Sequence, residues 1–244
     1  KIKSISTIPD YADECYQAAG WLKAFLDSFG MDAIIYESEG HPIVFSDYQT
    51  SRPEAKTILF YGHYDVQPVD PVSLWDSDPF DPVLSSIDNE PCIIARGASD
   101  DKGQLLTFLI ALKYIKNEVG ELPFSLKIIL EGEEECGSKT LPIFLEDYKD
   151  KLSADIAYVC DTGMWDKDTP AITRSLRGLL SEEFKIIGPD RDLHSGEFGG
   201  VAWNPIRIIT KILSDVYDDE GKVTIPNFYD GVNAVSYTHL TLPT

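Results

Sequence analysis

Hydrophobic positions along residues 1–172 alternate between helical and extended patterns. Residues 11–29 place apolar side chains on one face of a helix that ends at Gly30, and helices are also predicted over 104–116 and near 139–150. A stretch rich in Asp and Pro, 68–91, predicts irregular structure. Strands are predicted for the short runs AIIYE (33–37), PIVFSDY (42–48), TILFYG (57–62), CIIARG (92–97), SLKIIL (125–130) and DIAYVC (155–160). This alternation predicts an α/β domain, a mostly parallel sheet sandwiched by helices, over residues 1–172.

The pattern changes after residue 172. Residues 171–189 alternate apolar and polar positions, which predicts antiparallel strands with one face in solvent. A helix is predicted from Asn204 to Tyr217. We therefore expect residues 173–234 to be the beginning of a second, α+β domain.

The overall charge narrows the range of partners. The chain has 21 basic and 41 acidic residues among 244, a formal net charge of −20. This balance argues against nucleic acid and anionic membranes as partners. No apolar run approaches the roughly 20 residues of a membrane span. The four cysteines are scattered without a CxxC pair, which predicts free thiols in a reducing, cytoplasmic compartment. Because the chain starts at Lys1, the sequence leaves open whether a signal peptide precedes it.

Acidic residues and one histidine follow four of the predicted strands. Since ligands of open α/β sheets bind beyond the carboxyl ends of the strands, we expect these side chains to share one edge. They are His63 and Asp65 after TILFYG, Asp100 and Asp101 after CIIARG, Glu131 and Glu133–Glu135 after SLKIIL, and Asp161 after DIAYVC. Two like charges about 5 Å apart repel by roughly 3 kcal/mol at an effective dielectric near 20. The glutamates therefore either spread into solvent or surround a cation.

Each of these residues also has a purely structural interpretation. His63 and Asp161 fit turns, Asp100 fits the N-cap of the next helix, and Glu133–Glu135 fit the first turn of a helix. One shared metal site explains all four strand ends together. A set of histidine and carboxylates suits Zn²⁺, and also Mn²⁺ or Co²⁺. The surplus of carboxylates suits two metals, with a spare glutamate as general base and Asp65 fixing the His63 tautomer.

At these residues the chain resembles the di-zinc exopeptidases, a family that includes carnosinase-type dipeptidases, aminoacylases and glutamate carboxypeptidases. The similar segments occur in the family's order and span most of the chain. They are YGHYDVQP (61–68), WDSDPF (75–80), ARGASDDKGQ (95–104), LEGEEECGS (130–138), AYVCDTGMW (157–165) and DLHSGEFGG (192–200).

The resemblance implies a set of metal ligands. His63 and Asp161 would bind one zinc, Glu135 would bind the other, and Asp100 would bridge the two. The peptide bond after the bridging residue, Asp100–Asp101, is expected to be cis, as is common in the family.

The resemblance also implies three residues that act beside the metals. Glu134 would be the general base that takes a proton from water and passes it to the leaving amine. Asp65 would orient His63. His194 would come from the second domain, a lid or dimerisation domain, and stabilise the tetrahedral oxyanion, in many members across a homodimer. Glu131 and Glu133 receive no role.

Dipeptides or small peptides are the substrates that the resemblance implies. An aspartate at position 161 goes with dipeptidases and aminopeptidases, whereas glutamate goes with deacylases and carboxypeptidases. An N-acyl amino acid deacylase remains an alternative, as does a non-catalytic metal-binding relative. Glu134 argues against the latter, because a structural metal site needs no additional base.

The last ten residues, VSYTHLTLPT (235–244), match nothing in the family and are interpreted as a non-native tail. Relatives supply one further histidine ligand and the residues that bind the substrate carboxylate after the lid. His239 is not interpreted as that histidine. We therefore expect the 244-residue chain, expressed alone, to be poorly soluble and inactive.

Overall fold

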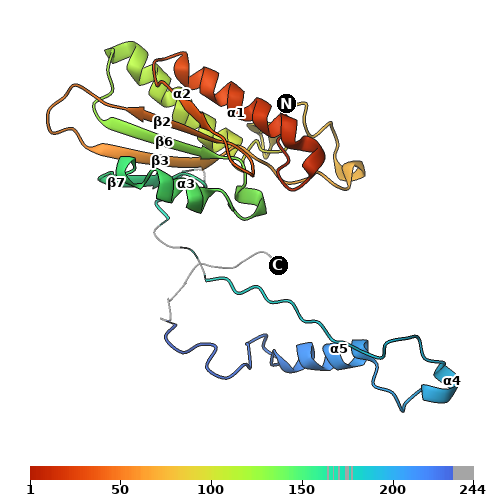
Figure 1. Ribbon diagram of the computed structural model, residues 1–244. Helices are drawn as coiled ribbons and strands as arrows, with labels where there is room; N and C mark the ends of the chain where they lie inside the picture. The colour runs from red at the N-terminus through yellow and green to blue at the C-terminus, as the bar shows by residue number, and fades with distance from the viewer. Residues whose placement is uncertain (164, 167, 170, 174–175, 177, 233–244) are drawn as a thin grey trace. The chain divides into compact units, whose positions relative to one another are not determined.

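The computed structural model describes residues 1–163, 165–166, 168–169, 171–173, 176 and 178–232. The chain divides into two compact units, Lys1–Thr173 and Arg174–Thr244. Each unit is described by itself (Figure 1).

A five-stranded mixed sheet forms the centre of the first unit, in the order β1-β2-β6-β3-β7. Its strands are β1 (Ile34–Tyr36), β2 (Ile43–Tyr48), β3 (Thr57–His63), β6 (Ser125–Glu131) and β7 (Ile156–Val159). Strand β3 runs parallel to both of its neighbours, β6 and β7, whereas β2 pairs antiparallel with β1 and β6. The carboxyl ends of β6, β3 and β7 therefore lie side by side.

Helices cover both faces of this sheet (Figure 1). Helices α1 (Ala12–Asp27) and α2 (Lys102–Val119) pack on one face, where every second residue of β6 points into the larger core. The opposite face of β2 and β6 packs against Phe144 of α3 (Leu141–Asp147). All seven residues of β6 are buried, which agrees with its continuous apolar sequence. The predicted α/β sandwich is confirmed.

The run CIIARG does not join this sheet, contrary to the sequence prediction. It forms the end of β5 (Glu90–Ile94), which pairs antiparallel with β4 (Val83–Ile87) in a separate two-stranded sheet. Strand β4 lies in the stretch predicted to be irregular. Ile93 is 59% exposed, so the hairpin surface lacks the coverage that a central strand receives. The loop between β5 and α2, rather than a strand of the main sheet, positions Asp100.

The N-terminal segment Ser4–Ser6 runs alongside the residues that follow β3. Ile5 forms a parallel bridge with Val66, whose N–H donates to the Ser4 carbonyl at 2.9 Å. The Ser4 hydroxyl donates to the Tyr64 carbonyl at 2.7 Å. The first residues of the chain are thereby attached to the segment that contains Asp65.

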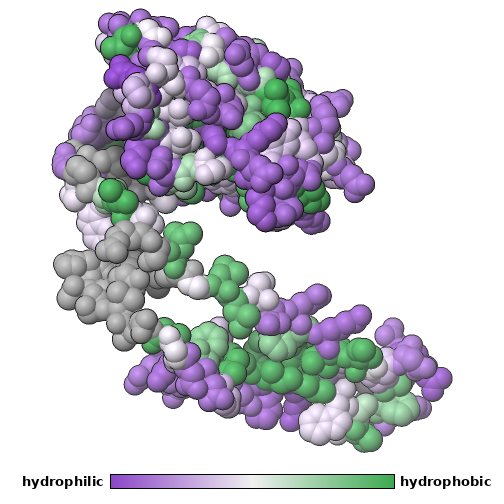
Figure 2. Space-filling model, turned by 60° about the vertical axis from the view of Figure 1, so that its left-hand side comes forward, coloured by the Kyte–Doolittle hydropathy of each residue, from purple (hydrophilic) through white to green (hydrophobic). Residues whose placement is uncertain are grey.

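The described residues of the second unit form two helices, α4 (Ser195–Phe198) and α5 (Pro205–Asp215). Helix α5 confirms the predicted helix, and its N-cap Asn204 accepts a hydrogen bond from the Ile206 N–H at 2.9 Å. The strands expected over 171–189 are absent from the described residues of that range, because no described segment supplies the paired neighbour that a strand requires. Hydrophobic side chains are correspondingly exposed on this unit (Figure 2). Among the described residues, no helix is long and apolar enough to cross a membrane.

Candidate metal-binding active site

His63 occupies the last position of β3, at the centre of the row of carboxyl ends. It lies opposite Glu131, the last residue of β6, and its side chain is fully buried. On the other side of β3, the chain leaving β7 reaches Asp161 two residues after the strand ends. The sheet topology therefore places one histidine between two acidic segments.

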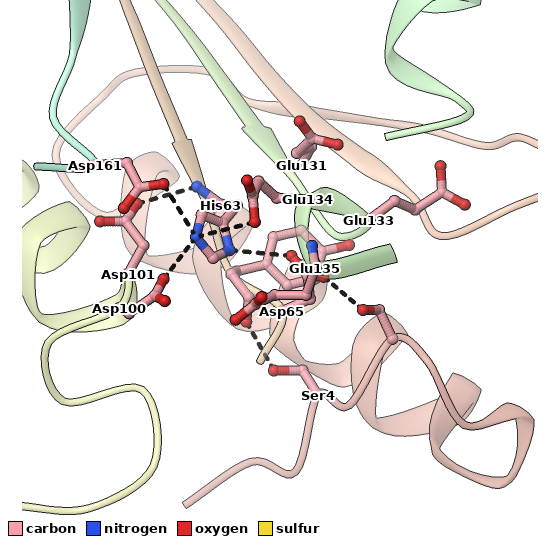
Figure 3. A network of polar contacts seen from close by, with 12 residues as sticks. Ser4, His63, Asp65, Asp100, Asp101, Glu131, Glu133, Glu134, Glu135 and Asp161 are labelled. Atoms are coloured by element: carbon pink, nitrogen blue, oxygen red, sulfur yellow. Dashed lines mark hydrogen bonds and ion pairs between the residues drawn. The ribbon is translucent and has the colours of Figure 1, made fainter. Parts of the chain in front are cut away.

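Both nitrogens of the His63 imidazole face carboxylates (Figure 3). Nδ1 lies 3.1 Å from Asp65 Oδ1, and Nε2 lies 3.0 Å from Asp100 Oδ1. Nε2 is also 3.9 Å from Glu134 Oε2 and 3.7 Å from Asp161 Oδ2. One donor atom from each of His63, Glu134 and Asp161 lies within 4.8 Å of the other two, a spacing that suits a single metal ion.

The carboxylates around His63 favour positive charge at the imidazole. Burial disfavours the imidazolium, but the hydrogen bond and charge of Asp65, with the charges of Asp101 and Glu134, outweigh it and raise the pKa of His63 to about 9. When Nδ1–H donates to Asp65, a neutral ring directs the Nε2 lone pair at three carboxylates. That arrangement is repulsive unless a proton or a metal ion lies between them.

Both carboxylate oxygens of Asp65 make polar contacts. Oδ1 contacts His63, while Oδ2 accepts from the Ser6 hydroxyl at 2.5 Å and from the Glu135 N–H at 3.1 Å. The side chain is completely buried. Asp65 therefore connects the N-terminal segment, the end of β3 and the glutamate cluster.

The four glutamates of LEGEEECGS (130–138) lie in different environments. Glu134 lies beside the imidazole, and burial raises the pKa of its carboxyl. Glu135 accepts from the Gln67 side chain at 2.9 Å. Glu133 points away from His63 (Figure 3), is buried, and accepts from the N–H groups of His41 and Thr140. Glu133 therefore anchors two loops instead of meeting solvent.

Glu131 is a buried acid at the end of β6. Its Oε1 accepts from the Tyr61 hydroxyl at 2.5 Å and from the Ser138 hydroxyl at 3.0 Å. Its Oε2 is buried without a hydrogen-bond partner among the described residues, and burial raises the pKa of the carboxyl. This carboxylate adds to the need for positive charge near the site.

Gly132 is required by a close approach of Tyr64. A Cβ atom at position 132 would lie 2.4 Å from the Tyr64 hydroxyl oxygen, and Tyr64 is only 1% exposed. Because Tyr64 separates His63 from Asp65 in the sequence, the glycine allows the glutamate segment to pack directly against the histidine segment.

Asp101 is a site residue to which the sequence analysis gave no role. It is completely buried, and its Oδ2 accepts from the His63 backbone N–H at 3.1 Å. Its Oδ1 has no partner among the described residues, and burial raises its pKa to about 6. Asp101, not Asp100, is the N-cap position of α2, and its side chain makes no capping bond. The interpretation of Asp100 as a helix cap is therefore wrong. The DD pair before a helix was the available signal.

The structure brings together most of the residues predicted for the site. Asp65, Asp100, Glu134 and Asp161 all surround His63. Glu135 borders this group through its backbone contact with Asp65. The peptide bond between Asp100 and Asp101 is cis, as expected. The remaining predicted residue, His194, belongs to the second unit, where it is the N-cap of α4 and its Nδ1 accepts from the Gly196 N–H at 3.0 Å. The roles assigned to these residues stay predictions.

Comparison with known proteins identifies the family. Residues 59–239 match the group described as Peptidase family M20/M25/M40. The chain belongs to this family. The match includes every segment in which a metal ligand was predicted, and the M20 assignment agrees with the predicted di-zinc exopeptidase resemblance.

Individual M20 relatives extend the comparison. The chain is 34% identical to the human Beta-Ala-His dipeptidase over 78% of its own length and 37% of the relative's. It is 35% identical to the Cys-Gly metallodipeptidase dug1 of Schizosaccharomyces pombe, over 81% of its own length and 41% of the relative's. A crystal structure of the M20 family metallo-carboxypeptidase Sso-CP2 from Sulfolobus solfataricus superposes with a TM-score of 0.74 at 33% identity, covering 97% of this chain and 52% of that one. The chain thus spans about two fifths of the length of the curated relatives it matches.

The donor set of this M20 chain fits divalent metal ions. It offers one imidazole and several carboxylate oxygens at one sheet edge, without a thiolate. Two further buried carboxylate oxygens, on Asp101 and Glu131, have no partner among the described residues. Borderline and hard divalent cations favour such nitrogen and oxygen ligands.

Proposed function

We propose that the protein to which this chain belongs is a metal-dependent dipeptidase that hydrolyses the peptide bond of dipeptides or small peptides. The observation that supports this most is the buried His63 at the carboxyl end of β3, whose Nε2 faces the carboxylates of Asp100, Glu134 and Asp161. Family membership and the dipeptidase names of two relatives agree with it.

Two zinc ions are the proposed cofactors, with Mn²⁺ or Co²⁺ as substitutes. His63 and Asp161 would hold one ion, Glu135 would contribute to the other, and Asp100 would bridge them. When bound, such ions act as Lewis acids that acidify water and polarise a peptide carbonyl. Asp65 keeps the proton of the imidazole on Nδ1, which leaves the Nε2 lone pair free to bind.

Glu134 is the proposed general base. Its Oε2 lies beside the histidine, and its side chain is 39% exposed, so both solvent and substrate can reach it. Burial raises its pKa, which improves its match to proton transfer near neutral pH. In the proposed reaction Glu134 removes a proton from the attacking water and later donates it to the leaving amine. A positioned base of this kind contributes about 10²–10⁴-fold in rate.

The remaining assignments concern the second unit and the setting of the protein. We propose that residues 173–234 begin a lid or dimerisation domain, that His194 stabilises the oxyanion, and that the protein forms a homodimer. The four cysteines are free, which supports the proposed cytoplasmic location.

A substrate panel tests the proposed function. The protein is expressed from its complete reading frame, stripped of metal with a chelator and reloaded with Zn²⁺, Mn²⁺ or Co²⁺. We expect hydrolysis of dipeptides in the reloaded protein only. Faster hydrolysis of N-acetyl or N-succinyl amino acids than of any dipeptide would instead establish a deacylase.

Substitution of Glu134 tests the base. Glu134→Gln should retain bound metal, measured by elemental analysis, and lose about 10²–10⁴-fold in kcat. Glu146→Gln is the control, because Glu146 is exposed on α3 and, within the part of the chain that the structure describes, its side chain pairs only with a surface lysine. Full activity in Glu134→Gln would show that another group transfers the proton.

A further inference from the structure

The carboxylate of Asp65 has two polar partners besides His63. Oδ2 accepts from the Ser6 hydroxyl at 2.5 Å and from the Glu135 backbone N–H at 3.1 Å. These bonds leave Oδ1 directed at the imidazole Nδ1, 3.1 Å away. The orientation of the carboxylate therefore depends on what holds Oδ2.

Ser6 is supplied by a segment far from the predicted motifs. The hydroxyl is buried, and the backbone around it is held in place by the bridge between Ile5 and Val66. The Ser6 carbonyl lies 3.1 Å from His41 Nε2, which fixes the residue from its other side. The hydroxyl thus has a defined position and a charged acceptor, the combination that makes a hydrogen bond short and strong.

We infer that Ser6 is a positioning residue for the metal site, acting through Asp65 on His63. The hydroxyl fixes Oδ2, the carboxylate plane is thereby fixed, and Oδ1 holds the imidazole with its proton on Nδ1. The same carboxylate holds the Glu135 backbone, so Ser6 influences a residue proposed for each metal. This inference rests on the proposed function, because it assumes that His63 binds metal.

Ser4 offers a matched control for this role. It lies in the same segment, is completely buried, and donates its hydroxyl to a backbone carbonyl, that of Tyr64, at 2.7 Å. Loss of either hydroxyl removes a buried hydrogen bond of similar length, although the Ser6 hydroxyl also interacts with the Cys136 thiol. Only the Ser6 bond ends on the carboxylate that contacts His63.

The experiment compares Ser6→Ala with Ser4→Ala in the protein expressed from its complete reading frame. The apparent Kd for Zn²⁺ is measured by competition with a chromophoric chelator. Removing a direct partner of a metal-binding histidine weakens affinity by about 10–100-fold. Because Ser6 lies one bond farther away, we expect a loss of roughly three- to tenfold in Ser6→Ala, and less than about twofold in Ser4→Ala. The Co²⁺-loaded Ser6→Ala protein should also show a shifted visible absorption spectrum, which a defect in folding alone would not produce.

Two further variants keep the inference testable. In an Asp65→Ala background, Ser6→Ala should have no additional effect on the Kd, since the connecting carboxylate is already gone. Ser6→Thr retains the hydroxyl and should bind Zn²⁺ like the wild type, whether or not Ser6→Ala folds. A folded Ser6→Thr with weakened binding would overturn the inference.

The outcomes separate the inference from the proposed function. If the wild type binds Zn²⁺ and Ser6→Ala matches Ser4→Ala in affinity and spectrum, the positioning role is wrong while the metal site stands. An equal effect of Ser6→Ala with and without Asp65 would also overturn the role. If the wild type binds no divalent metal, both the inference and the proposed function fail.

Discussion

Replacing Asp65 with asparagine is a strong test of how the site is organised, because it preserves shape and removes one acceptor. Asp65 accepts along both oxygens, whereas asparagine has one acceptor oxygen and one donor NH₂ group. If the amide oxygen faces His63 Nδ1–H, the NH₂ group confronts the Glu135 N–H, a donor that was 3.1 Å from Oδ2. If the amide is flipped, the NH₂ group donates to Nδ1, and the imidazole proton moves to Nε2, where it blocks metal binding.

The size of the effect of Asp65→Asn depends on which orientation of the side-chain amide costs less free energy. The first orientation leaves the partly buried Glu135 N–H without its acceptor, at a cost of about 1–3 kcal/mol in the free energy of unfolding. The second preserves folding stability but weakens metal affinity by about 10–100-fold, the range measured for groups that orient metal-binding histidines. Either the free energy of unfolding or the free energy of Zn²⁺ binding must therefore fall by at least about 1 kcal/mol.

The assay measures both quantities on the same sample. Urea denaturation of the metal-free protein gives the free energy of unfolding, and chelator competition gives the Kd for Zn²⁺. Asp47→Asn is the control, since Asp47 is exposed on β2 and accepts only from the Gln49 side chain among the described residues. Unchanged stability together with unchanged affinity in Asp65→Asn would refute the role assigned to this carboxylate.

Two further predictions concern packing and pH. Gly132→Ala should lower the free energy of unfolding by about 1–3 kcal/mol, because its Cβ would lie 2.4 Å from a buried Tyr64 oxygen. Gly20→Ala is the control, because nothing lies within 4 Å of a Cβ at that position. An equal urea midpoint for the two variants would contradict the close packing of Gly132 against Tyr64. Burial raises the pKa of the Cys15 thiol from 9.0 to about 12, so the unfolded chain loses this proton first and the thiol's contribution to stability falls as pH rises from about 9 to 12. Urea denaturation across that window should show a shallower decline in Cys15→Ala, and parallel curves would refute the shift.

The sequence predicted the central elements of the fold because hydrophobic runs identify buried strands well. It did not predict their partners. CIIARG is as apolar as TILFYG, yet it lies in the β4–β5 hairpin, because an apolar run does not specify which strand will bond to it. Residues 171–189 show the same limit, since their alternating pattern describes a strand only when a neighbour is present.

The candidate site was predicted to the extent that its residues follow strands. His63, Asp65, Glu134 and Asp161 were identifiable because they follow apolar, strand-like runs. Ser6 was not, because a single serine 59 positions from its partner Asp65 has no local signature. The burial of Glu133 was equally unpredictable, since only the folded loops reveal the two backbone donors that it accepts from.

Strand β7 connects the candidate metal site to the border of the main sheet formed by the described residues. It lies at the edge of the main sheet formed by the described residues, spans four exposed residues and pairs there only with β3. Asp161 follows two residues later and lies 3.7 Å from His63. A metal ion bound by both Asp161 and His63 would hold the end of β7 in place. Local unfolding of this strand and dissociation of the ion would then occur together. Metal binding would therefore also stabilise the pairing of β7 with β3.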